Sequence, residues 1–278
     1  MCRLFMCISK GKNVYWYKIV KSFYLASTYD PLLESISGKR SHDHGWGFVT
    51  YKFLHGKASI SYYRSSIPIA SDAEGLILLR NIGETSAEIQ LIIAHSRLTS
   101  ENEVKNVQNT HPFLVHVVGK FSFWLAHNGR VSKTSLAKEV GFTKHISEYS
   151  DTFFLATYLA KRLPKMSSLS EVIDILREII EKKYVISALN IAVLAIIEDN
   201  EAYAFTLNYI SPKVKNKEEY YKLYEINLGA HVKVIASSTF AKYFKEGEIE
   251  PMRNGDIVFL RMKNYELEFY KENILNSA

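Results

Sequence analysis

Cysteine is scarce in this sequence, with only two in 278 residues. That number is too small for a disulfide-rich secreted scaffold. Cys2 and Cys7 would lie roughly 16 Å apart on one extended strand, at about 3.3 Å per residue, so they are not expected to pair with each other. The N-terminus also lacks the basic, apolar and small-residue segments of a secretory signal. These absences predict a reduced, cytoplasmic protein.

Long apolar runs are missing as well. The longest one covers residues 185–197 and is interrupted by Ser187 and Asn190. It is too short to cross a bilayer and predicts a buried strand, so no membrane association is expected. Hydrophobic residues make up 47% of the chain and charged residues 23%, which is typical of a globular protein.

Charge of one sign is not concentrated anywhere, although the formal net charge is +6. Lysine and arginine are spread along the chain and mixed with acids, and neither a basic helix nor a zinc-finger spacing occurs. The excess therefore indicates a solvated basic surface, and nucleic acid is not expected as a partner.

Patterns that hold cofactors are absent too. No phosphate-binding loop and no dinucleotide-binding glycine pattern occurs, so no cofactor is expected. His95, His111 and His127 do not show the helical spacing of a metal site, so no metal is assigned.

Strand-like segments rich in β-branched and aromatic residues dominate the first half of the chain. Two helices follow, at residues 150–163 and 167–183; the first ends at Pro164 and the second begins with a capping box from Ser168 to Glu171. The order of strands, helices and strands predicts a single domain over residues 1–278, with two packed sheets and helices outside. The predicted strands cover residues 2–9, 45–53, 57–65, 87–98, 119–129, 188–209 (a pair with an acidic turn at 198–201), 232–239, 256–262 and 265–273.

Cys2 stands on the first residue of an apolar strand, at a place where chains usually fray. One interpretation is a small buried hydrophobe that happens to be cysteine. The other is that removal of Met1 leaves Cys2 at the N-terminus. Its thiol would then be a nucleophile whose own α-amino group serves as the base.

Four further stretches carry candidate functional residues. They are Gly-Trp-Gly at 45–47, Arg97 followed by Asn-Thr-His-Pro-Phe at 109–113, His-Asn-Gly at 127–129, and Ser-Asp-Thr at 150–152. Taken singly, each has an ordinary structural explanation, such as a turn, a helix cap, a core tryptophan or a solvent-facing arginine.

Taken in order with the initial Met-Cys-Arg, these motifs resemble the class II glutamine amidotransferases, which are N-terminal-nucleophile hydrolases. The pattern is most similar to the small stand-alone members of that family. The resemblance covers the motifs from Cys2 to about residue 160 and extends more loosely to the C-terminus. It implies an α+β fold of four layers (αββα), with two mostly antiparallel sheets between helical layers.

The resemblance implies a catalytic role for Cys2, which would attack a side-chain amide carbonyl as the thiolate. The α-amine of Cys2 has a reference pKa near 8 and would act as general base, through a water. The side-chain N–H of Asn128 and the backbone N–H of Gly129 would stabilise the tetrahedral oxyanion.

Four other residues would bind substrate by the same resemblance. Arg97 would clamp the α-carboxylate with a two-pronged contact, and Asp151 would pair with the α-ammonium group. Thr99 and His111 are also placed on the substrate. Residues 98–102 depart from the family's pattern, and His44 stands where stand-alone relatives carry Asp.

The expected reaction is hydrolysis of glutamine or a γ-glutamyl amide through a γ-glutamyl thioester on Cys2. One alternative is a glutaminase subunit that delivers ammonia to a separate synthase. The other is a catalytically silent family member that serves as a binding module.

Overall fold

The computed structural model describes residues 2–99, 103–144, 146–163, 168–198, 201–264 and 266–276. Several positions that carry expectations lie outside these ranges: Met1, residues 100–102, Pro164, Ser167, residues 199 and 200 of the acidic turn, and Tyr265. Within the described ranges, no helix combines the length and apolar character needed to cross a membrane.

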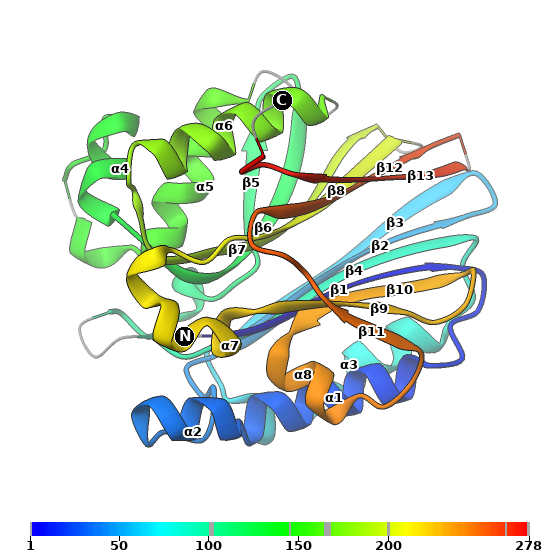
Figure 1. Cartoon of the computed structure of the whole chain (residues 1–278). Helices are drawn as coiled ribbons and strands as arrows, with labels where there is room; N and C mark the ends of the chain where they lie inside the picture. Colours follow the sequence, from blue (N-terminus) through cyan, green and yellow to red (C-terminus); the bar gives the residue numbers. More distant parts are fainter. Residues whose placement is uncertain are drawn as a thin grey trace.

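Two antiparallel sheets face each other at the centre of the molecule (Figure 1). The first has the strand order β11-β9-β10-β1-β4-β2-β3 and the second the order β13-β12-β8-β7-β6-β5. The strands of the first sheet are β1 (Cys2–Lys10), β2 (Trp46–Leu54), β3 (Lys57–Ser65), β4 (Ile89–Arg97), β9 (Leu223–Asn227), β10 (Val232–Ser237) and β11 (Glu248–Pro251). Those of the second are β5 (Phe113–Val117), β6 (Phe121–Val131), β7 (Val185–Glu198), β8 (Glu201–Asn208), β12 (Asp256–Lys263) and β13 (Glu266–Asn273).

Helices cover the outer face of each sheet (Figure 1). On the side of the first sheet lie α1 (Trp16–Thr28), α2 (Pro31–Ser37), α3 (Ala73–Glu84) and α8 (Ser238–Tyr243). On the side of the second lie α4 (Lys133–Val140), α5 (Asp151–Arg162) and α6 (Leu169–Glu181). The remaining short elements are α7 (Glu218–Tyr221) and the 3-10 turns η1 (Ile69–Ser71), η2 (Val107–Asn109), η3 (Ile146–Glu148) and η4 (Pro212–Lys217). The predicted four-layer α+β architecture is confirmed.

The two predicted helices are confirmed, each with a serine at its N-cap. The hydroxyl of Ser150 accepts a hydrogen bond from Phe153 N (3.3 Å) at the start of α5. The hydroxyl of Ser168 accepts one from Glu171 N (3.3 Å) at the start of α6. Each bond satisfies an amide that has no partner inside its own helix.

The predicted order of strands, then helices, then strands is wrong in the first half of the chain, where α1, α2 and α3 lie between strands. Helix α1 is rich in aromatic and β-branched residues, which favour strands, and its N-cap residue, Tyr15, forms no side-chain cap. Its helical form is stabilised by packing on the first sheet, through residues such as Trp16 and Phe23. Tertiary packing has therefore overridden the local preference.

Strand β1 is buried on both faces because it lies between the second sheet and the helices. Leu4, Met6 and Ile8 belong to the core between the sheets. Phe5 and Cys7 belong to the core beneath the helices. Side chains alternate along a strand, so Cys2 shares the face of Leu4 that is turned toward the second sheet.

Candidate active site

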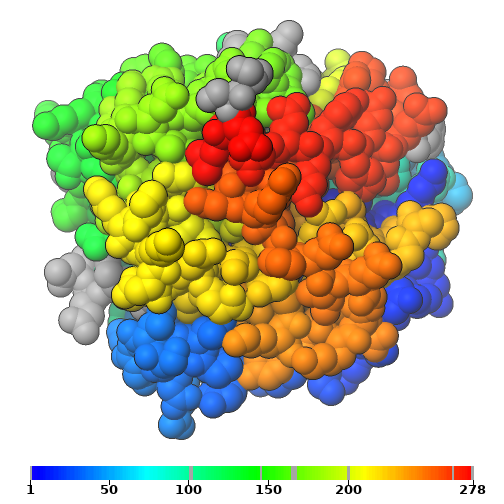
Figure 2. Space-filling model, in the orientation of Figure 1, coloured from blue at the N-terminus to red at the C-terminus, as the bar shows by residue number. Residues whose placement is uncertain are grey.

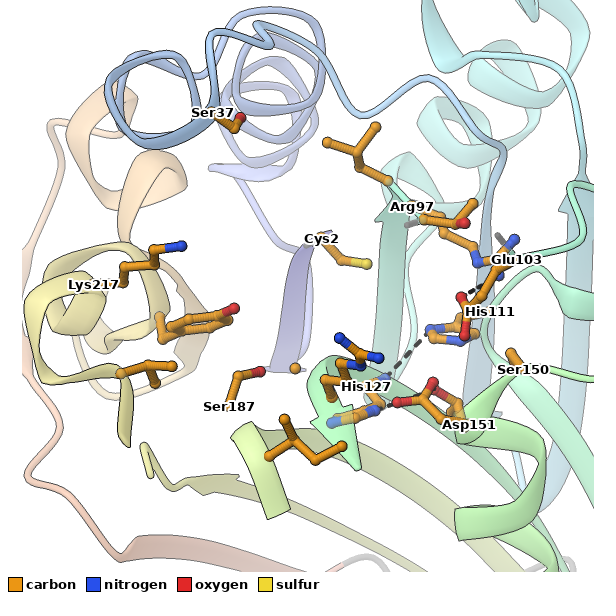
Figure 3. Close-up of a pocket in the computed structure, with 18 of the residues that line it drawn as sticks. Cys2, Ser37, Arg97, Glu103, His111, His127, Ser150, Asp151, Ser187 and Lys217 are labelled. Carbon is orange, nitrogen blue, oxygen red and sulfur yellow. Dashed lines mark hydrogen bonds and ion pairs between the residues drawn. The ribbon is translucent and has the colours of Figure 1, made fainter. Parts of the chain in front are cut away.

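A cavity of about 760 Å³ opens at the end of the sandwich where β1 begins (Figure 3). Its volume lies in the range that small-molecule ligands fill. Figure 2 shows the segment of η4 and α7 (yellow) on the surface directly above α2 (blue), and residues of these elements form part of the wall. Of the seven predicted site residues, six line the cavity: Cys2, Arg97, Thr99, His111, Gly129 and Asp151.

Cys2 lies between two groups of wall residues. Figure 3 shows its side chain with Arg97 and Asp151 on one side and Lys217 on the other. Cys2 is only 6% exposed and pairs with Arg97 in the register of β1 and β4. Its backbone nitrogen donates a hydrogen bond to Asn128 Oδ1 at 3.0 Å. This bond connects the first strand of one sheet to β6 of the other, and it fixes the position of the Cys2 nitrogen.

Asn128 is the seventh predicted residue, and it lies beside Cys2 in the described structure. Because its Oδ1 accepts from Cys2, its Nδ2 is left as a donor. That Nδ2 is buried and has no hydrogen-bond partner among the described residues. A buried donor without a partner costs about 1–3 kcal/mol, so this N–H is a group that a bound substrate could satisfy.

Gly129 is held against the neighbouring strand. A Cβ atom at this position would lie 1.9 Å from Ala188 O and 2.8 Å from His127 Nε2. Both distances are far below van der Waals contact, so no other residue fits without moving β7. The backbone of β6 can therefore lie close to Ala188 and also face the cavity.

Strand β7 has a β-bulge next to this glycine. Gly129 pairs with Leu189, whereas Val131 pairs with Val185, so residues 186–188 stand opposite a single residue of β6. Ala188 pairs instead with Ile210. Two residues of this β-bulge, Ile186 and Ser187, lie in the cavity wall.

A buried polar network lies behind Cys2. The Arg3 guanidinium forms an ion pair with Asp30 (2.6 Å), and both side chains are fully buried. Arg3 Nη1 also donates to Cys2 O (3.3 Å) and to Tyr220 O (3.1 Å). The carboxylate of Asp30 accepts further hydrogen bonds from His42 Nε2 (2.8 Å) and from the Thr239 hydroxyl (2.6 Å). The network holds the peptide after Cys2 against α2 and α7.

The charges of this network follow from their partners. Burial alone would raise the pKa of Asp30, but hydrogen bonding from His42 and the Arg3 charge together hold that pKa well below its usual value. Burial and the nearby Arg3 charge lower the pKa of His42 to about 4. His42 is therefore neutral at pH 7 and donates to an ionised carboxylate.

Three buried histidines adjoin one another below the cavity. His95 Nε2 lies 3.1 Å from His127 O, and His127 Nε2 lies 3.1 Å from Ala188 O. Carbonyl oxygens only accept, so both Nε2 atoms carry hydrogen. Burial lowers the pKa of all three rings, that of His95 to about 3, and keeps them neutral.

The same network assigns the hydrogen of His111. Its Nδ1 lies 3.1 Å from His95 Nε2 and 3.5 Å from His127 N, both of which are donors, so Nδ1 accepts. The hydrogen of neutral His111 is therefore on Nε2, which is buried and has no partner among the described residues. Like Asn128, His111 thus has an unused donor next to the cavity. Among the described residues, no three histidine, cysteine or acidic side chains are grouped to hold a metal ion.

Arg97 already has partners in this cavity. Its side chain is 3% exposed, and its Nη2 lies 3.3 Å from Glu103 Oε2 (Figure 3). Its Nη1 donates to Val104 O at 3.1 Å. Burial and the nearby charge of Asp151 raise the pKa of Glu103.

Asp151 and Thr99 lie on the same wall. Asp151 Oδ2 accepts from Val131 N at 2.9 Å, which ties the start of α5 to the end of β6. Thr99 N donates to His44 Nδ1 at 3.1 Å. Within the described residues, the two departures from the family's pattern therefore meet where Thr99 contacts His44.

The Gly-Trp-Gly motif supports the site from outside the cavity. A Cβ atom at Gly47 would lie 2.6 Å from His111 O, and one at Gly45 would lie 2.8 Å from Thr110 Oγ1. Arg97 N donates to Gly45 O at 2.8 Å. This motif therefore holds Arg97 and the Asn-Thr-His-Pro-Phe segment together, and the His111–Pro112 peptide bond within that segment is cis.

Sequence reasoning assigned no role to Arg3, Asp30, His42 or Glu103. Arg3 directly follows Cys2, and Asp30 precedes Pro31 as a helix-cap signal would. Asp30 does cap α2, accepting from Leu32 N and Leu33 N at 3.1 Å. No local pattern marks His42 or Glu103, because their partners, Asp30 and Arg97, come into contact with them only in the folded chain.

Two enzymes are among the solved structures that share this fold. One is the glutamine phosphoribosylpyrophosphate (PRPP) amidotransferase from B. subtilis complexed with ADP and GMP, with a TM-score of 0.55 and 17% identity over 98% of this chain and 49% of that chain. The other is described as the allosteric regulatory enzyme of purine biosynthesis, with a TM-score of 0.56 and 16% identity over the same shares. No family model and no curated protein matches the sequence.

The chain thus shares its fold with these two solved enzymes, and the fold is the four-layer α+β architecture that its motifs predict. It spans about half the length of the two solved chains that it matches.

Proposed function

We propose that this protein hydrolyses the side-chain amide of glutamine or of a γ-glutamyl compound, with Cys2 as its N-terminal nucleophile after removal of Met1. The Cys2 sulfur attacks the amide carbonyl, and its proton passes to the α-amine and then to the departing ammonia or amine. Water next attacks the γ-glutamyl thioester. This step releases glutamate and restores the thiol.

One observation carries the proposal. The Cys2 nitrogen is held at 3.0 Å by Asn128 Oδ1, while the Nδ2 of the same side chain is buried and has no partner. A single asparagine thus orients the group that would serve as base and keeps a donor ready for the oxyanion. Gly129 follows it in β6 and also lines the cavity, so its backbone N–H is the second donor that we propose for the oxyanion. Removing one such donor typically costs about 3 kcal/mol in the barrier.

The side of the cavity that holds Arg97 and Asp151 (Figure 3) favours a substrate that is recognised by its amino-acid head group. Arg97 can bind an α-carboxylate in two places, and Asp151 can pair with an α-ammonium group. The unused Nε2–H of His111 and the hydroxyl of Thr99 add polar contacts on the same side. Opposite charges on two groups select for a zwitterion.

A second candidate is ammonia delivery to a synthase partner. One of the two solved structures is an amidotransferase, and this chain matches 49% of each solved chain. In that case free glutaminase activity would be low until the partner is present.

The first test is the intact mass of the purified protein, which we expect to lack Met1. Treatment with a glutamine-like electrophile should then add one label at Cys2 and none at Cys7. A correctly folded protein that keeps Met1 and still cleaves glutamine at full rate would overturn the mechanism.

A second assay separates the two candidate functions. Ammonia release from glutamine is compared with glutamate release from γ-glutamyl peptides. Rapid release without a partner favours the stand-alone hydrolase, whereas a quiet enzyme that labels at Cys2 favours ammonia delivery.

A further inference from the structure

Arg97 is buried and already binds a carboxylate of its own chain. Glu103 Oε2 lies 3.3 Å from Arg97 Nη2, and the Arg97 side chain is 3% exposed. A buried guanidinium without a counter-charge is strongly unfavourable, so some carboxylate has to accompany it. In this structure that carboxylate is Glu103.

The position of Glu103 is electrostatically poor. Its side chain is 24% exposed, and the charge of Asp151 opposes its own. Removing Glu103 from the wall would relieve that repulsion. A zwitterionic head group brings a carboxylate for Arg97 and an ammonium group for Asp151, so it replaces the charge of Glu103 and reverses the repulsion at once.

We propose that Glu103 is a specificity-determining residue, an internal competitor that the α-carboxylate of the substrate displaces from Arg97. The inference rests on the proposed function, because it uses Arg97 as the clamp for that carboxylate. Its consequence is selectivity: ligands that lack an α-carboxylate leave the Arg97–Glu103 pair intact, whereas amino-acid head groups exchange one carboxylate for another.

The test compares Glu103→Gln and Glu103→Ala with the wild type. Either change removes the competing charge, so we expect the KM for glutamine to fall by about threefold to tenfold, which corresponds to about 0.6–1.4 kcal/mol. The kcat should change little, because Glu103 does not contact Cys2 in the described structure. Glu74→Gln is the matched control, since Glu74 is exposed on α3 and makes the same charge change away from the cavity.

A binding measurement makes the test independent of catalysis. In a Cys2→Ala background, Glu103→Gln should tighten L-glutamate by the same factor and leave 4-aminobutanoate, which lacks the α-carboxylate, unchanged. The inference is wrong if the affinity for L-glutamate stays constant or falls, or if both ligands tighten in parallel, as a merely loosened wall would give.

Failure of the proposed function has a different signature. In that case no variant cleaves any γ-glutamyl amide, whereas the binding ratio between L-glutamate and 4-aminobutanoate still decides whether Glu103 competes for Arg97.

Discussion

The two cysteines of β1 lie on the same strand, five positions apart, and are both buried and free. Cys7 is 1% exposed and packs beneath the helices with Phe5 and Trp16. Burial raises its pKa to about 12, although Asn13 Nδ2 donates to its sulfur at 3.6 Å. Cys2 lies at the cavity, where Asn128 accepts from its nitrogen instead.

The difference shows that two buried cysteines on one strand can have different chemical surroundings. Each cysteine has an asparagine partner, but the partner of Cys7 binds the sulfur and the partner of Cys2 binds the nitrogen. Opposite Cys7 in the register of β4 stands Ile92, and opposite Cys2 stands Arg97. Of the two cysteines, Cys2 is therefore the one that faces a charged residue across the β1–β4 pair.

The largest expected effect comes from replacing each cysteine by alanine. Cys2→Ala should lower kcat for glutamine hydrolysis by about 10⁴-fold or more, because no other group supplies the thiolate. Cys7→Ala should keep kcat close to that of the wild type. Steady-state ammonia release measures both, and substantial activity in Cys2→Ala would contradict the assignment of the nucleophile.

The second comparison exchanges the asparagine partners. Asn128→Ala removes an oxyanion donor, so kcat should fall by about 10²–10³-fold. Asn13→Ala removes only the hydrogen bond to the Cys7 sulfur and should leave kcat nearly unchanged. If both variants lose activity to the same extent, the loss comes from stability, which thermal unfolding of each variant would show.

The third comparison concerns the residues opposite each cysteine. Arg97→Lys should raise the KM for glutamine by more than about tenfold, because lysine cannot make the two-pronged contact. Ile92→Val, opposite Cys7, should leave KM unchanged. An unchanged KM in Arg97→Lys means that the carboxylate clamp is misassigned.

The smallest expected effect is on the free energy of unfolding. Here the substitution at Cys7 should have the larger effect and the substitution at Cys2 the smaller one. Cys7→Ala should lower the free energy of unfolding by about 1–2 kcal/mol through lost packing. Cys2→Ala, at the cavity, should change that free energy by less than about 0.5 kcal/mol. Urea denaturation of both variants measures the difference, and equal losses would mean that Cys2 is a packing residue as well.

Much of the architecture could be predicted because five short motifs occur in the order typical of one fold. Six of the seven predicted site residues line one cavity because the fold brings these motifs to the same end of the sandwich. Their roles stay predictions. The helix α1 could not be foreseen, since its aromatic sequence favours a strand until the first sheet packs against it. Arg3–Asp30 and Arg97–Glu103 depend on neighbours that only the fold brings together.

The β-bulge at residues 186–188 of β7 has a consequence for how such a site could be altered or transplanted. Three residues, 186–188, span the distance that one residue covers on β6, and two of them form cavity wall. Part of the cavity wall thus depends on the length of the backbone in β7 as well as on side chains. Deleting one residue there would shift the register of β7 and turn the neighbouring side chains to the opposite face, so a grafted version needs the whole irregular segment, not only its catalytic groups.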